Sequence, residues 1–224
     1  MTIYTQVITT EESSLTVVSA PTLPYAPVQY QREYHDALNN ILRLYFNRID
    51  ALVSQLRVGN LNTLALPYGS FADTTDQTTT ANTATVMTFD TTDFANGVSI
   101  VTSGGKASRI TVATAGIYNF QWSGQFQNTD TQLHDVSVWV RKDGTDVVGS
   151  TGLISVPNSH GGVNGHTIAG WNFFFSFNAG DYIELWWSTS SAQVSIQAYP
   201  VSTTPTRPST SSLVATMAFV SALP

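Results

Sequence analysis

One stretch of the chain has the pattern of a long helix, and the residues after it have the pattern of strands. Residues 31–57 contain no Gly or Pro, and their apolar side chains recur at alternating spacings of four and three. About 27 residues at roughly 1.5 Å each predict a helix about 40 Å long. The expected seam of this helix consists of Leu38, Leu42, Tyr45, Ile49, Leu52 and Leu56.

An amphipathic helix of this kind must bury its apolar stripe against something. It could pack on its own domain, but the β-type residues form a separate block, so we favour self-association about a symmetry axis. Leu at both kinds of seam position and the aromatic Tyr45 make the seam wide. Three strands fit such a seam better than two, so we expect a trimeric coiled-coil stalk.

Residues 1–30 form an extended N-terminal arm in this interpretation. Pro21, Pro24 and Pro27 recur at spacing three, and each fixes its own φ and biases its predecessor to extended backbone. The arm is either a disordered tail or a segment that becomes ordered on a partner. We favour the second because the arm is too apolar for a plain flexible linker. The anchoring side chains would be Leu15, Val17, Leu23, Tyr25 and Val28.

Residues 58–67 are expected to be a connector, since Gly59 is placed to end the helix. Residues 68–224 then alternate polar and apolar positions between turn signals such as Asp143-Gly144. Strands are expected near residues 85–89, 98–101, 109–112, 116–127, 135–142, 145–149, 167–178, 181–188, 194–198 and 213–222. Many strands without a helix predict a mainly β head, an antiparallel sandwich or barrel.

Composition excludes several classes of protein. Charged residues make up only 11% of the 224, and the formal net charge is −6, so a nucleic-acid footprint is not expected. No apolar run approaches the roughly 20 residues that span a bilayer, and no signal peptide is expected in the arm. The absence of Cys excludes disulfides and thiolate sites.

The β block resembles the C1q/TNF-like jelly roll over roughly residues 68–222. The residues that carry the resemblance are a Gly-x-Tyr-x-Phe element followed by a further Phe, and a Gly-Asp-x-apolar-x-Leu element. They are Gly116, Tyr118, Phe120 and Phe126, then Gly180, Asp181, Ile183 and Leu185. The resemblance implies a compact homotrimer with a stalk before the head.

The order of arm, helix and head, with the helix sequence itself, also resembles virion structural proteins of tailed bacteriophages and cyanophages. This second resemblance implies a protein of the virion surface, made in the host cytoplasm. We therefore expect a trimeric knob or short fibre, either a capsid decoration or a short tail fibre, docked to other virion proteins by its arm. The alternative is an adhesion module that binds a host receptor or glycan.

No catalytic residue, metal site or cofactor is expected. Asp181 and Glu184 are close in sequence, but we expect Asp181 to cap a turn and Glu184 to point away from the core. Calcium could bind at Asp130 with Asp135 or at Asp143 with Asp146, and zinc at His160 and His166 about a threefold axis. The chain has no dense carboxylate loop, and two imidazoles are an incomplete zinc site, so we favour surface loops.

Aromatic side chains are expected on both faces of the late strands. Trp171, Phe173, Phe175 and Phe177 alternate and should face the interior of the sandwich. The rings that point the other way are Phe174, Tyr182 and Trp186. A neighbouring subunit of the trimer would cover them, because an exposed aromatic patch is an aggregation liability. The alternative for these three rings is a surface on which glycans stack.

Overall fold

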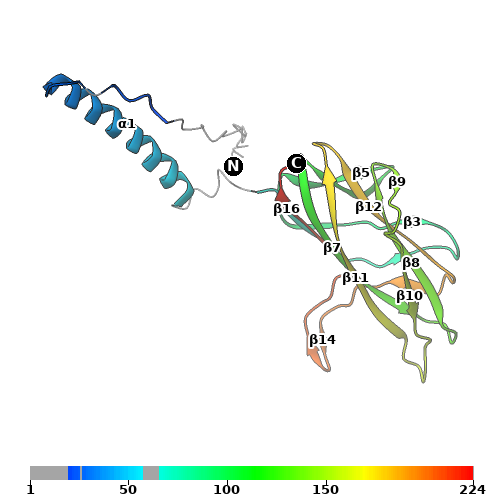
Figure 1. Cartoon of the computed structure of the whole chain (residues 1–224). Coiled ribbons are helices and arrows are strands. Elements are labelled where there is room, and N and C mark those ends of the chain that lie inside the picture. Colours follow the sequence, from blue (N-terminus) through cyan, green and yellow to red (C-terminus); the bar gives the residue numbers. More distant parts are fainter. Residues whose placement is uncertain (1–19, 26, 58–65, 224) are drawn as a thin grey trace, which may run out of the picture. The chain divides into compact units, whose positions relative to one another are not determined.

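The computed structural model describes residues 20–25, 27–57 and 66–223. By its internal contacts the chain divides into two compact units, residues 1–65 and residues 66–224. Each unit is described by itself. Figure 1 shows the helix of the first unit and the β-rich head of the second.

The first unit contains one helix, α1 (Arg32–Arg57), of 26 residues. Residues with high helix propensity fill it, and Glu33 in the first turn opposes the positive end of the helix dipole. Arg32 and Asp36 form an exposed ion pair at 3.6 Å, four residues apart. The helix therefore matches the predicted range to within one residue at its start.

The head is an antiparallel sandwich of two sheets, as the sequence predicts. Sheet I contains β1 (Tyr68–Asp73), β2 (Gln77–Thr78), β4 (Thr91–Asn96), β7 (Gly116–Asn128), β11 (Gly165–Phe177), β13 (Val194–Ile196) and β16 (Leu213–Ser221). Sheet II contains β3 (Thr85–Val86), β5 (Val98–Ser103), β6 (Lys106–Val112), β8 (His134–Lys142), β9 (Thr145–Asp146), β10 (Gly152–Val156) and β12 (Tyr182–Thr189). A separate hairpin joins β14 (Ser202–Thr203) and β15 (Thr206–Arg207).

In sheet I the order β4-β1-β16-β7-β11 makes neighbours of strands that lie far apart in sequence. β11 pairs with β7 along all of its length and forms the edge of the sheet, while β13 and β16 share the other side of β7. The order β10-β8-β12-β6-β5 in sheet II is likewise non-sequential. Such crossing connections are compatible with a jelly roll.

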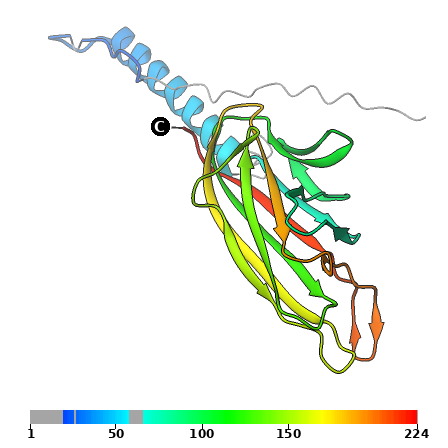
Figure 2. The same ribbon diagram turned by 90° about the vertical axis from the view of Figure 1, so that its right-hand side faces the viewer.

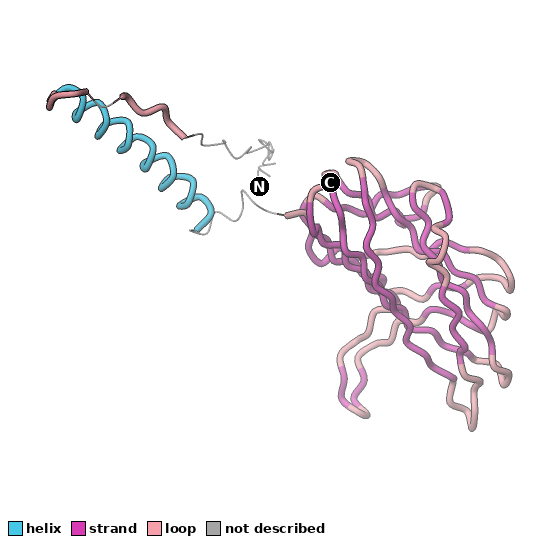
Figure 3. The backbone as a smooth tube through the Cα atoms, in the orientation of Figure 1, coloured by secondary structure: helices cyan, strands magenta, loops and turns pink. Residues whose placement is uncertain are grey.

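The core lies between the two sheets and consists of alternating inward positions from both. Its largest fully buried side chains include Phe71, Tyr118, Phe120, Phe126, Phe177, Ile183, Leu185 and Trp187. Strand residues make up most of the head, and loops occur mainly at its ends (Figure 3). The β14–β15 hairpin, orange in Figure 2, projects at one end. The chain enters the head at Pro67, whose carbonyl accepts a hydrogen bond from Phe219 N in β16 at 2.8 Å.

The predicted turn at Asp143-Gly144 is present and connects β8 to β9. Both residues have positive φ, 48° and 80°, as a tight two-residue hairpin turn requires. β4 was not predicted, because the sequence TTDFAN does not alternate and four of its six residues are exposed. The strand predicted at residues 85–89 is shorter in the structure, where β3 covers only Thr85–Val86.

Candidate functional site

The outer face of sheet I carries no charge along its three longest strands. β7, β11 and β16 contain no Asp, Glu, Lys or Arg at all. Alternate residues point into the core, so the others point outward. The outward positions are amides, small side chains and a few apolar ones, among them Ile117, Asn119, Gln121, Ser123, Gln125, His166, Ile168, Asn172, Phe174, Val214, Thr216 and Ala218.

Several apolar side chains on this face are open to solvent. Phe174 is 61% exposed and Ile168 is 71% exposed, both on the edge strand β11. Asn119 of β7 lies between Phe174 and Ala218, and its Oδ1 accepts a hydrogen bond from Asn172 Nδ2 at 3.1 Å. A face that is extended, uncharged and partly apolar is suited to contact another protein surface.

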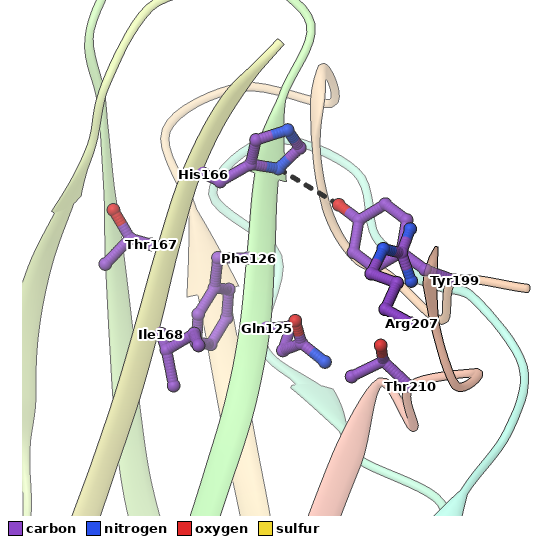
Figure 4. Close-up of a pocket in the computed structure, with 8 residues that line it drawn as sticks. All are labelled: Gln125, Phe126, His166, Thr167, Ile168, Tyr199, Arg207 and Thr210. Atoms are coloured by element: carbon purple, nitrogen blue, oxygen red, sulfur yellow. Dashed lines mark hydrogen bonds between the residues drawn. The ribbon is translucent and has the colours of Figure 1, made fainter. Parts of the chain in front are cut away.

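A hollow of about 460 Å³ lies at one end of this face, where β11 meets the segment that carries the β14–β15 hairpin (Figure 4). The Tyr199 hydroxyl lies 3.0 Å from His166 Nδ1 and 3.2 Å from Gln127 Oε1. Arg207 is the cation in the lining, and its Nη1 donates to the Pro200 carbonyl at 3.2 Å. Burial and the Asp76 carboxylate raise the pKa of Tyr199, so this phenol stays protonated at neutral pH.

The outer face of sheet II is built differently, because two arginines cover its rings. The Arg109 guanidinium lies 4.1 Å from the centre of the Tyr182 ring, and that of Arg141 lies 3.9 Å from the Trp186 ring. The cover expected from a neighbouring copy thus comes, for these two rings, from the same chain. Phe174 lies on the other sheet, so the structure does not bring the three predicted rings together.

Glu184 points away from the core, as predicted, yet it is only 7% exposed. Its Oε1 accepts from Ser108 Oγ at 3.1 Å and from Arg109 Nε at 3.4 Å, and its Oε2 accepts from Trp186 Nε1 at 3.3 Å. Three donors from β6 and β12 therefore surround the carboxylate. Sequence reasoning missed this cluster because Ser108 and Glu184 are 76 residues apart.

The aromatic residues that alternate in β11 follow the predicted side but not the predicted burial. Phe177 is fully buried, Phe173 and Phe175 pack partly buried against the core, and Trp171 is 47% exposed. The physical reason is that β11 is the edge strand of sheet I, so it has a neighbouring strand on one side only and the middle of the strand is less covered than its buried ends. Neighbouring rings lie 5.6 to 6.0 Å apart, and Trp171 packs over Gly152 of β10, where a Cβ would meet the ring at 1.9 Å.

The residues that carry the family resemblance take structural positions. Gly116 packs beneath Phe219, whose ring leaves no room for a Cβ, and Gly180 turns the chain with φ of 89°. Asp181 Oδ2 accepts from Asn178 N at 2.8 Å, the predicted turn cap. The remaining members of the set are buried in the core: Tyr118, Phe120, Phe126, Ile183 and Leu185.

Tyr118 combines burial with a polar function. Its hydroxyl donates to the Thr114 carbonyl at 2.8 Å. Burial raises the pKa of Tyr118 to about 12, because the charged phenolate is disfavoured away from water.

The described seam residues of the helix are half-buried: Leu38, Leu42, Tyr45 and Ile49. Beside them Leu44, Phe46 and Val53 are exposed. The side chains of Leu52 and Leu56 lie outside the described residues, as do Leu15 and Val17 of the arm. Leu23, Tyr25 and Val28 of the arm are exposed.

The carboxylates and histidines considered for metals are engaged separately. Asp130 accepts from the His134 ring at 2.8 Å, and this bond lowers the pKa of Asp130. Asp135 accepts from Ser155 Oγ, Asp143 from Tyr182 N, and Asp146 from Arg141 and Trp139. Within the described residues no three His, Cys, Asp or Glu side chains form a group able to hold a metal ion.

Comparison with models of known families gives no match, and comparison with curated proteins gives none either. Among the residues that the structure describes, no helix is both long and apolar enough to cross a membrane.

Proposed function

We propose that this protein is a non-enzymatic structural component of a bacteriophage particle, a homotrimer whose head is displayed at the virion surface. It is a capsid decoration or a short tail fibre, and its head belongs to the C1q/TNF-like jelly rolls. The observation that carries the trimer is the absence of charged side chains from the three longest strands of sheet I. The non-sequential strand order of both sheets supports the jelly roll.

In a trimer each side chain near the threefold axis meets its own copies, so a single charge there becomes three like charges close together. A surface without charge avoids this repulsion. The outer face of sheet I avoids this by using Asn and Gln, which both donate and accept hydrogen bonds. Phe174 and Ile168 supply apolar area that association removes from water.

The helix supports the same assembly. Its apolar stripe remains half-buried or exposed among the described residues, and a lone amphipathic helix is marginal in water. We expect the double variant Leu42→Asp, Leu52→Asp to place charge in a three-stranded seam, at a cost of several kcal/mol per trimer. Analytical ultracentrifugation of the variant should give a lighter species, and a parental mass with a parental melting temperature would contradict the stalk.

The arm is the proposed attachment to other virion proteins. Tyr25 and Val28 are fully exposed, so their apolar surface is available to pockets on a partner, and extended backbone can add to a sheet edge. Three arms on one trimer multiply a weak affinity if all can reach their sites. A chain lacking residues 1–30 should keep the parental solution mass and fail to incorporate, whereas incorporation at parental occupancy would shift the attachment to the head.

Quantitative mass spectrometry of gradient-purified virions tests the proposed location. Peptides of this chain should co-purify with the particle at a copy number divisible by three. Recovery only in the unassembled fraction of the lysate would contradict a place in the virion. The alternative, an adhesion module for a host receptor or glycan, is favoured by the outer face of sheet II, where aromatic rings and cations meet.

A further inference from the structure

The outer face of sheet II contains a hollow of about 410 Å³ that no part of the proposed trimer uses. Its lining includes Lys106, Arg109, Arg141, Tyr182, Glu184 and Trp186, from β6, β8 and β12. All of these residues belong to one head. The site therefore depends neither on the number of copies in the assembly nor on the location of the protein in a particle.

Positive charge is concentrated in this hollow. Residues 66–224 contain five Lys or Arg and ten Asp or Glu, so the head as a whole is acidic. Three of those five cations line the hollow, together with the Glu184 carboxylate, and the Asp146 carboxylate lies 2.8 Å from Arg141 Nε, so cations exceed carboxylates by one there. A concave surface that gathers cations in an otherwise acidic protein attracts anions to one place.

Both arginines are held in position before any ligand arrives. Arg109 lies over Tyr182 while its Nε bonds to Glu184 at 3.4 Å, and Arg141 lies over Trp186 while its Nε bonds to Asp146 at 2.8 Å. These bonds use the Nε of each guanidinium. Among the described residues the Nη groups of both have no acceptor, so they remain able to bind an oxyanion in a forked geometry.

Lys106 supplies a third donor. It is exposed, follows the turn between β5 and β6, and its ammonium group makes no hydrogen bond or ion pair within the described part of the chain. Glu184, by contrast, already accepts from Ser108, Arg109 and Trp186, so its carboxylate holds Arg109 in position.

We propose that this hollow binds an acidic saccharide through its carboxylate, sulfate or phosphate group. The cations select the oxyanion. The volume has room for on the order of ten water molecules at about 30 Å³ each, far more than a lone oxyanion needs. The half-buried Tyr182 and Trp186 side chains, already covered by the arginines, and the Thr85 hydroxyl form the rest of the lining against which the sugar ring that carries the oxyanion would lie.

Isothermal titration of the full-length protein tests this proposal with four probes. A sulfated heparin tetrasaccharide and an oligogalacturonate represent two sources of the oxyanion, maltotetraose is the neutral control, and sodium sulfate is the bare anion. At least one acidic saccharide should bind, with an affinity that falls as ionic strength rises, and at least tenfold more tightly than sulfate or maltotetraose. Equal binding of maltotetraose, equal binding of sulfate alone, or no binding of either acidic saccharide would overturn the proposal.

Two matched variants locate the binding. Lys106→Gln removes the donor that has no structural partner, and it should weaken binding about tenfold with an unchanged melting temperature. Lys142→Gln removes the same charge one residue beyond Arg141, where the side chain lies toward Phe177 and the Ser176 carbonyl instead of the hollow. It should change the affinity less than twofold. Equal losses in the two variants would mean that only net charge matters and would contradict the site.

Discussion

The two outer faces of the sandwich differ in whether their aromatic and apolar side chains are covered by other residues of the same chain. Along its long strands sheet I presents Asn, Gln, Ser and Thr, the exposed ring of Phe174 and no charge. Sheet II presents Arg109, Arg141 and Glu184, and its rings are covered from within the chain. A face whose apolar groups are already covered needs no partner to shield it, whereas a face that leaves Phe174 and Ile168 open gains from one.

Because of this difference we assign a separate role to each face. The proposed contact between copies uses the uncharged face, and the proposed ligand hollow uses the charged one. The Tyr199–His166 hydrogen bond and Arg207 of β15 line the hollow at one end of the uncharged face (Figure 4).

The largest effect should be on the oligomeric state, when charge is placed on the uncharged face. In the double variant Gln121→Glu, Phe174→Glu, each copy brings two carboxylates to the proposed contact, and burying unpaired charge costs several kcal/mol. We expect the assembly to dissociate in sedimentation velocity. The matched control Ser137→Glu, Ser188→Glu puts the same charge on the outer face of sheet II and should leave the mass unchanged; equal behaviour of both variants would remove the distinction between the faces.

Removing the charge of the buried Glu184 carboxylate should have an intermediate effect, on the free energy of unfolding. Glu184→Gln leaves Arg109 without its ionic partner. It also replaces one carboxylate oxygen, which accepts hydrogen bonds, with an amide nitrogen, which donates them. We expect the free energy of unfolding to fall by about 1–3 kcal/mol in urea denaturation, because hydrogen bonds to a charged group are lost. Thr151→Ala, at an exposed loop position, should stay within about 0.5 kcal/mol. A Glu184→Gln protein as stable as its parent would show that the cluster is dispensable.

The pH dependence of the charged face should be the smallest of these effects. Hydrogen bonds from Arg141 and Trp139 lower the pKa of Asp146 in the folded protein. A lowered pKa stabilises the fold above the unfolded value, near 3.8, and this contribution is lost as pH falls through the folded pKa. Asp146→Asn should therefore flatten the fall in melting temperature below pH 4. Identical acid profiles for variant and parent would contradict a stabilising bond.

The features that depend on neighbouring residues could be predicted from the sequence. The helix is predicted at residues 31–57 and observed at Arg32–Arg57, because its seam and the absence of Gly and Pro are local signals. The turn at Asp143-Gly144 and the cap at Asp181 are local as well. Strand alternation likewise predicts most of β7, β8, β11, β12 and β16.

The pairing of strands could not be predicted, and the candidate site depends on it. Arg141 lies opposite Glu184 only because β8 and β12 are neighbours in sheet II, and no local signal fixes that register. One signal was available: Glu184 is the single charged residue of β12, and a carboxylate buried in a strand needs a cation as partner. The same limit explains why the sequence alone assigns the cover of Tyr182 and Trp186 to a neighbouring copy.

The mass of the full-length protein in solution distinguishes a trimer from a monomer. Light scattering during size-exclusion chromatography measures it without reference to shape, at low micromolar concentration and in physiological salt. The account predicts three times 24.2 kDa, unchanged on dilution, because the uncharged face of sheet I and the helix seam associate together. A stable species of 24.2 kDa would contradict the claim that this face is a contact between copies.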